Sequence, residues 1–234
     1  MTLEQARVDL KRRRNATKAK TLQRFFKTGP GEYAEGDKFL GVVVPQTRAV
    51  AKKFQTLSLR DALILLKSPW HEERLLALFL MVGRYRREPG DRGAVYKAYL
   101  GHTGYINNWD LVDSSAEHIV GPYLADRSKA PLKRLARSKS LWERRIAVLA
   151  TFHYIKQGDF KDALALAAQL LRDEEDLIHK AVGWMLREIG KRDLPVLDAF
   201  LRKHCQQMPR TMLRYAIEKH PPARRRAYLS GQIH

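Results

Sequence analysis

Hydrophobic residues recur at spacings of three and four along most of the chain, which is the period of an amphipathic α-helix. Clear examples cover residues 75–82, 146–154 and 182–189, and period-two alternation is nearly absent. Short breaks that contain Gly, Pro, Asp or Ser separate helical segments of roughly 10 to 16 residues. The pattern therefore predicts an all-α fold.

The predicted helices begin in a similar way, and five equivalent positions follow one another at separations of 39, 32, 35 and 34 residues. They are Arg74, Asp113, Arg145, Lys180 and Arg214. This period is typical of stacked two-helix repeats of the HEAT or armadillo kind. We expect about six such repeats in a curved α-solenoid. The whole chain, 1–234, is expected to be one domain with a basic C-terminal tail at 221–234.

Equivalent positions of a solenoid line up along one face, so the repeat has a chemical consequence. Arg74, Arg145, Lys180 and Arg214 would form a row of cations on the concave surface, which Asp113 interrupts once. Such a row suits a phosphate backbone. The alternative is that each basic residue only begins a helix and extends into solvent.

The charge balance points to the same class of partner. Lys and Arg number 44 against 25 acidic residues, a net charge of +19 over 234 residues. Such an excess is expected of proteins that bind nucleic acid or an anionic membrane. No apolar run approaches the ~20 residues that span a bilayer, and the N-terminus lacks the apolar core of a signal peptide. We therefore expect a cytoplasmic protein that binds nucleic acid and not a membrane.

The segment 108–113 places an aromatic ring beside two carboxylates in this basic chain. Trp109 and Asp113 are four residues apart and share a helix face. An indole beside a carboxylate can recognise a cation through ring quadrupole and charge. Asp110 points about 100° away from Trp109, which suits a capping or solvent-exposed role. The simpler alternative is that Trp109 belongs to the core and an aspartate caps the helix.

Several other patterns exclude function classes. The single cysteine, Cys205, allows no intrachain disulfide and is expected to be a packed small hydrophobe. The segment 71–74 (His-Glu-Glu-Arg) lacks the second histidine of a zinc-protease helix, and the loop 29–37 lacks the Lys-Ser end of a P-loop. We expect no metal and no small-molecule cofactor. Three histidines within helical patterns are expected to be structural or on the surface: His118, His153 and His179.

Four segments match a known family in their order along the chain: 38–42 (Lys-Phe-Leu-Gly-Val) followed by Pro45, 109–113 (Trp-Asp-Leu-Val-Asp), 141–148 (Leu-Trp-Glu-Arg-Arg-Ile-Ala-Val), and 180–188 (Lys-Ala-Val-Gly-Trp-Met-Leu-Arg-Glu). Over most of its length the chain resembles the DNA alkylation repair glycosylases of the AlkD family. The resemblance implies a HEAT-like solenoid that holds duplex DNA in its concave face. It also implies hydrolysis of the N-glycosidic bond of positively charged alkylated purines, with the lesion left stacked in the duplex. We expect a monomer.

The resemblance also implies roles for single residues. Asp113 matches the catalytic carboxylate, Trp109 and Trp184 the aromatic walls that contact the deoxyribose of the lesion, and Arg145 a cation that contacts phosphate. Phe25 stands where some relatives carry a tyrosine. Further basic residues are expected to contact DNA: Arg48, Arg74, Lys180, Arg187 and Arg214.

The expected chemistry agrees with these residue types. A purine alkylated at N3 or N7 leaves as a neutral base, so positive charge develops on the sugar and no general acid is required. A fixed carboxylate stabilises that oxocarbenium-like state. Two alternatives remain: a noncatalytic HEAT-repeat DNA-binding scaffold, and a scaffold for protein or RNA. The presence of Trp109, Asp113, Arg145 and Trp184 argues against the first. The second predicts no dependence on Asp113, so one substitution separates it from the enzyme.

Overall fold

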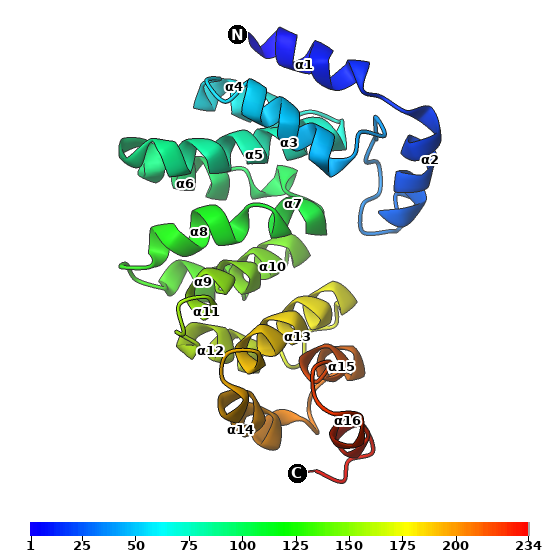
Figure 1. The fold of residues 1–234 in the computed structure, drawn as a ribbon, viewed down its shortest axis with the longest axis vertical. Helices are drawn as coiled ribbons and strands as arrows, with labels where there is room; N and C mark the ends of the chain where they lie inside the picture. The colour runs from blue at the N-terminus through cyan, green and yellow to red at the C-terminus, as the bar shows by residue number, and fades with distance from the viewer. Residues whose placement is uncertain (234) are drawn as a thin grey trace. The chain divides into compact units, whose positions relative to one another are not determined.

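The computed structural model describes residues 1–233 as a succession of helices (Figure 1). Within that range no strand forms, and an isolated bridge joins Lys38 to Trp70. The prediction of an all-α fold is therefore confirmed. The chain divides into two compact units, Met1–Ser115 (unit 1) and Ala116–His234 (unit 2).

Unit 1 is built around one long helix, α5. Its helices are α1 (Leu3–Arg12), α2 (Ala16–Phe25), α3 (Val44–Lys53), α4 (Leu59–Leu66), α5 (His71–Arg87), η1 (Pro89–Asp91), α6 (Arg92–Leu100), η2 (Thr103–Tyr105) and α7 (Trp109–Asp113). Helix α5 packs against α3, α4, α6 and α7. Its residues 75–82 are all buried, because a helix covered by neighbours on several sides is apolar all round.

Unit 2 continues the alternation of helices. Its helices are α8 (Ala116–Leu124), α9 (Ala130–Leu135), α10 (Leu141–Ala150), α11 (Phe152–Ile155), α12 (Lys161–Gln169), α13 (Asp176–Gly190), α14 (Leu194–His204), α15 (Arg210–Ala216) and α16 (Pro222–Leu229). Helices α8, α10, α13 and α15 each pack against the next. The basic tail expected at 221–234 is thus helical over Pro222–Leu229.

Two glycines make this packing close. A Cβ at Gly121 would lie 2.5 Å from the carbonyl oxygen of Ala150, and one at Gly183 would lie 2.5 Å from that of Met212. Each glycine therefore lets its helix approach the backbone of a later helix more closely than any other residue would. The same device joins α8 to α10 and α13 to α15, as expected of repeated units.

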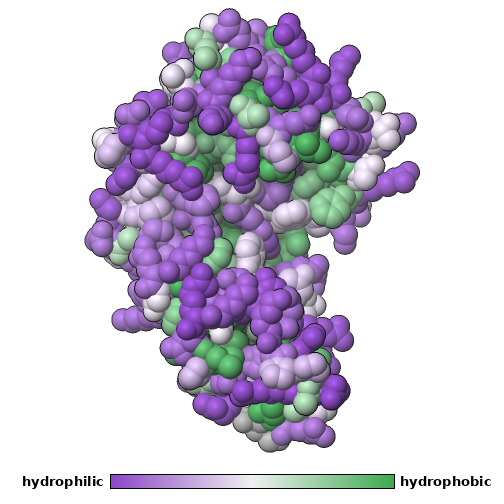
Figure 2. Space-filling view, in the orientation of Figure 1, coloured by the Kyte–Doolittle hydropathy of each residue, from purple (hydrophilic) through white to green (hydrophobic). Residues whose placement is uncertain are grey.

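The face in Figure 2 is mostly hydrophilic, with small apolar patches between the polar side chains. No helix among residues 1–233 combines the length and the apolar character needed to cross a membrane.

Candidate active site and DNA-binding surface

Helix α7 carries the Trp109–Asp113 pair. Asn108 begins the helix, and its side-chain oxygen accepts a hydrogen bond of 2.8 Å from the backbone N–H of Trp109. Asp110, Leu111 and Val112 are buried. Trp109 and Asp113 are both partly exposed. Helix α7 therefore presents an indole and a carboxylate together on the side that faces away from the core.

Two phenylalanines at the end of α2 hold the Trp109 ring. Phe26 is buried and stacks on Trp109, with ring centroids 5.2 Å apart and planes 22° apart. Phe25 meets Trp109 edge-on at 5.9 Å and is 61% exposed. The sequence comparison pointed to Phe25 but not to Phe26. Two adjacent phenylalanines at the end of an otherwise polar helix could have indicated that one of them packs on another aromatic ring. Together they fix one side of the indole and leave a large apolar ring in solvent beside it.

Behind α7 lies a buried polar cluster formed by His71, Asp110, Asp37 and Arg74. The Nε2 of His71 lies 2.8 Å from Asp110 Oδ2, and its Nδ1 lies 3.2 Å from Asp37 Oδ2. Burial alone would lower the pKa of His71, but the two carboxylates raise it to about 9. The imidazole is therefore a cation at neutral pH, and both of its nitrogens donate.

The polar cluster corrects two sequence-based expectations. Asp110 is neither a helix cap nor solvent-exposed, because it is buried and accepts a hydrogen bond from His71. Arg74 is 4% exposed and donates to Asp37 Oδ1 at 2.7 Å and to the carbonyl of Ser68 at 3.1 Å. An arginine used in this way stabilises the interior, so Arg74 is not part of an exposed cationic row.

The segment 38–42 is held by Glu72. This buried carboxylate accepts hydrogen bonds from the backbone N–H groups of Leu40 (2.9 Å), Gly41 (2.8 Å) and Val42 (3.1 Å). Gly41 has a φ of +81°, and a Cβ there would lie 2.0 Å from the carbonyl oxygen of Asn15. Only glycine fits this close approach. The segment therefore fastens the start of α2 to the start of α5.

In unit 2, Trp184 lies on α13 beside Phe152 of α11, with ring centroids 5.7 Å apart in an edge-on arrangement. Two cations lie near the Phe152 ring: Lys156 Nζ at 4.2 Å and Arg192 at 6.0 Å from its centroid. The sequence did not point to Phe152 as the neighbour of Trp184, nor to the two cations near the Phe152 ring. Their signal was weak, because an aromatic residue and two basic ones in separate helices form no motif.

The predicted DNA contacts of unit 2 differ in exposure. Lys180, Trp184 and Arg187 are partly exposed on α13, at spacings of four and three that place them on one side of it. Lys180 pairs with Asp176 at 2.7 Å, and Arg187 pairs with Glu218. Arg214 of α15 is exposed.

Arg145 is placed differently from those residues. It is 5% exposed, and its guanidinium donates to the carbonyl of Leu177 at 2.5 Å. Arg145 therefore joins α10 to the first turn of α13, and the expectation of an exposed row fails here as it does at Arg74.

Unit 1 also carries exposed basic residues, on α3 and on α2. Arg48 of α3 is exposed, with its guanidinium 4.3 Å from the centroid of Phe79. Helix α2 has no buried residue and no acidic residue in its first turn. A hollow of about 330 Å³ lies along it, lined by Ala16, Thr17, Lys20, Thr21 and Arg24. Cations beside hydroxyl groups suit a phosphate.

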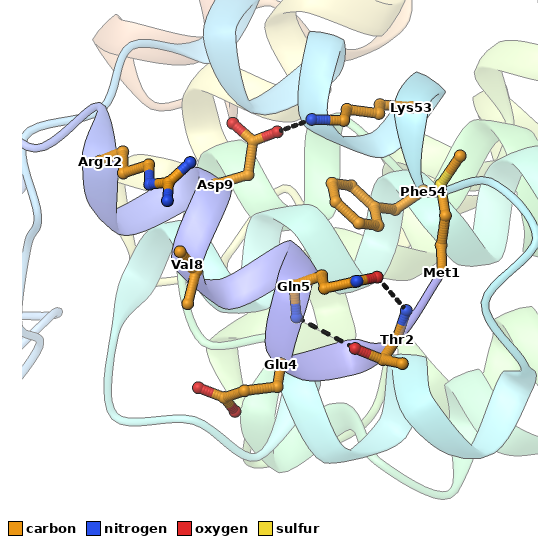
Figure 3. A pocket seen from close by; sticks show the side chains of 9 residues that line it. All are labelled: Met1, Thr2, Glu4, Gln5, Val8, Asp9, Arg12, Lys53 and Phe54. Atoms are coloured by element: carbon orange, nitrogen blue, oxygen red, sulfur yellow. Dashed lines mark hydrogen bonds and ion pairs between the residues drawn. The ribbon is translucent and has the colours of Figure 1, made fainter.

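A larger hollow of about 600 Å³ lies at the N-terminal helix (Figure 3). Asp9 and Lys53 form an ion pair of 2.7 Å there, and Thr2 and Gln5 cap α1 through reciprocal hydrogen bonds. Its lining includes none of the predicted site residues. Within residues 1–233, no group of three or more His, Cys, Asp or Glu side chains is arranged to hold a metal ion.

Comparison with known proteins gives the family. The family described as DNA alkylation repair enzyme matches residues 6–220. The chain belongs to this family. A solved structure described as a predicted DNA alkylation repair enzyme from Enterococcus faecalis superposes with a TM-score of 0.70 at 18% identity, over 90% of this chain and 98% of that one. At this identity the likeness concerns the fold. No curated protein matches the chain.

Membership supports a role in the repair of alkylated DNA for this member of the DNA alkylation repair family. DNA as the substrate also agrees with the net charge of +19.

Proposed function

We propose that this member of the DNA alkylation repair family is a DNA glycosylase. It would hydrolyse the N-glycosidic bond of cationic alkylated purines, such as N3-methyladenine and N7-methylguanine, in duplex DNA. One observation carries the proposal: α7 presents Trp109 and Asp113 together on its exposed side. A carboxylate close to a surface that binds a polyanion is unfavourable for binding, so its place beside the indole is consistent with a role in the reaction.

The proposed reaction needs few protein groups. The alkylated base already carries the positive charge, so it departs neutral without a proton from the enzyme. Asp113 stabilises the oxocarbenium-like sugar that remains and orients the attacking water. The face of Trp109 attracts the cationic sugar by about 0.5 to 2 kcal/mol. The resemblance implies the same kind of contact for Trp184.

DNA binding is assigned to cations that solvent reaches. In unit 1 these are Arg48 and the basic side chains of α2, which are exposed, and in unit 2 they are Arg214, which is exposed, and Lys180 and Arg187, which are partly exposed. Contacts of this kind hold the phosphate backbone without reading bases. Following the family, we propose that the lesion stays stacked in the duplex. Arg145 is proposed as an indirect contributor that holds α13 in place.

The test is release of bases from duplexes that each carry one lesion. We expect release of N7-methylguanine and N3-methyladenine, whereas uracil and hypoxanthine, which are neutral, should persist. Efficient release of the neutral bases would contradict a mechanism without a proton donor. Tight binding to the duplexes with no release of any base would instead indicate a noncatalytic DNA-binding scaffold.

A further inference from the structure

We propose that His71 positions Trp109 and Asp113 by joining the Asp110 carboxylate of α7 to the Asp37 carboxylate. The part of this inference that concerns excision rests on the proposed glycosylase function, whereas the structural part does not. His71 does not face the reacting atoms. It acts through Asp110, so it is a positioning residue.

Helix α7 needs support from outside because it is short. It spans five residues, Trp109–Asp113, and so few residues gain little from helical hydrogen bonds alone. Asn108 caps its start. Its second residue, Asp110, then receives the hydrogen bond of 2.8 Å from His71. This bond therefore fixes the turn that carries Trp109 and leads to Asp113.

Asp110 depends on His71 for this bond. Within residues 1–233, the other carboxylate oxygen of Asp110, Oδ1, is buried without a hydrogen-bond partner. Loss of the imidazole would leave a buried carboxylate with neither oxygen satisfied, which is strongly unfavourable. The simplest relief is movement of Asp110 towards solvent, and α7 would turn with it.

A second contact links His71 to the same indole. The His71 ring stacks on Phe39 with centroids 4.5 Å apart, and its centroid lies 5.0 Å from that of Phe26. Phe26 in turn stacks on Trp109 at 5.2 Å. His71 thus reaches Trp109 along a polar route through Asp110 and an aromatic route through Phe26.

The charges around His71 favour its cationic form. The groups that face it are Asp110 from α7, Asp37 from the segment before α3, and Arg74 from its own helix. Two carboxylates, one guanidinium and one imidazolium sum to zero, whereas a neutral His71 leaves one buried negative charge uncompensated. Its raised pKa of about 9 agrees with this balance.

The chain offers a matched control in unit 2. His220 is 6% exposed, and its Nε2 lies 2.9 Å from Asp198 Oδ1, so it forms a buried His–Asp bond like that of His71. His71→Gln and His220→Gln each replace a buried imidazole that faces a carboxylate with a neutral amide. Both should lower the melting temperature. Only His71→Gln should slow single-turnover release of N7-methylguanine, by about 10- to 100-fold, with the Kd for undamaged duplex unchanged within about twofold.

Nuclear magnetic resonance tests positioning without any reaction. The carbon-bound Cδ1–H resonances of the four tryptophans can be assigned with single Trp→Phe variants. In the wild type the Trp109 resonance should move with a midpoint near pH 9, following the pKa of His71. In His71→Gln that titration should vanish. The Trp184 resonance should be the same in both proteins.

The outcomes separate the two proposals. Three results would each overturn the positioning role. They are a wild-type rate of base release in His71→Gln, an equal loss of that rate in His220→Gln, and a Trp109 resonance whose pH titration is the same with and without His71. If the wild type releases no base, the glycosylase proposal fails while the Trp109 titration still decides this inference. Should His71→Gln not fold, the wild-type titration and Asp110→Asn decide instead. Asp110→Asn removes one of the two carboxylates that raise the pKa of His71, so the midpoint of the Trp109 titration should move to lower pH; an unchanged midpoint would overturn the inference.

Discussion

At the scale of single residues, Asp113 and Asp110 show how three positions of a helix change the role of a carboxylate. Asp113 lies on the exposed side of α7, whereas Asp110 is buried against His71. The pattern of residues predicted that the two would face different directions. It could not predict the partner of Asp110, because His71 lies 39 residues away and has no counterpart in a local motif.

The first prediction concerns Asp113→Asn. The amide keeps the shape of the side chain but removes the charge that stabilises the cationic sugar, so single-turnover base release should fall about 100- to 1000-fold. Affinity for DNA should stay the same or rise, because a negative charge has left the DNA-binding surface. Asp126→Asn removes an exposed carboxylate from unit 2 and should change neither quantity. Near wild-type release by Asp113→Asn would refute its assignment.

The second prediction is the pH dependence of stability that His71 confers. Its pKa is about 9 in the folded protein against about 6.5 unfolded, so the folded state binds the proton more tightly. The contribution is complete below about pH 6.5 and is lost as pH rises through 9. It amounts to about 3 kcal/mol. Urea unfolding of wild type and His71→Gln at pH 6 and pH 10 measures it, and a gap of equal size at both pH values would contradict it.

At the scale of helices, the sequence predicted the elements better than their ends. The apolar spacing in residues 75–82 and 182–189 marks α5 and α13 plainly, because burial imposes the helical period on side chains. The first turn of α5 was harder. His71, Glu72 and Arg74 are polar residues that the sequence would place at the surface. Each is instead buried and hydrogen-bonded to a residue from a distant segment. Only tertiary contacts give them that role.

The third prediction tests the close packing of α13 on α15. In Gly183→Ala, the new methyl group would lie 2.5 Å from both the Met212 carbonyl oxygen and the Tyr215 Cβ, so the helices must separate. We expect a loss of about 1 to 3 kcal/mol in the free energy of unfolding. Gly90→Ala is the control, because no atom lies within 4 Å of its Cβ position. Equal stability of the two variants in urea would show that the contact is not tight.

At the scale of the whole molecule, the charge of +19 and the repeat pattern predicted an all-α protein that binds a polyanion. The basic residues available for that task could not be read from the repeat alone. Arg74 and Arg145 occupy equivalent positions to Lys180 and Arg214 but are buried. A basic side chain at a helix start can pair inwards or face solvent, and its neighbours in space decide which.

The last prediction follows from that division of the cations. If exposed side chains neutralise phosphates, log affinity for undamaged duplex should fall with log salt at a slope of about −0.9 for each phosphate contacted. Arg214→Ala and Arg48→Ala should each make the slope shallower by about one unit. Arg74→Ala should instead lower the melting temperature and leave the slope unchanged, because its guanidinium is engaged with Asp37 and Ser68. Fluorescence anisotropy across a salt series measures the slope. The assignment of the DNA-binding cations would be wrong if Arg74→Ala made the slope shallower. It would also be wrong if the affinity of the wild type did not change with salt concentration.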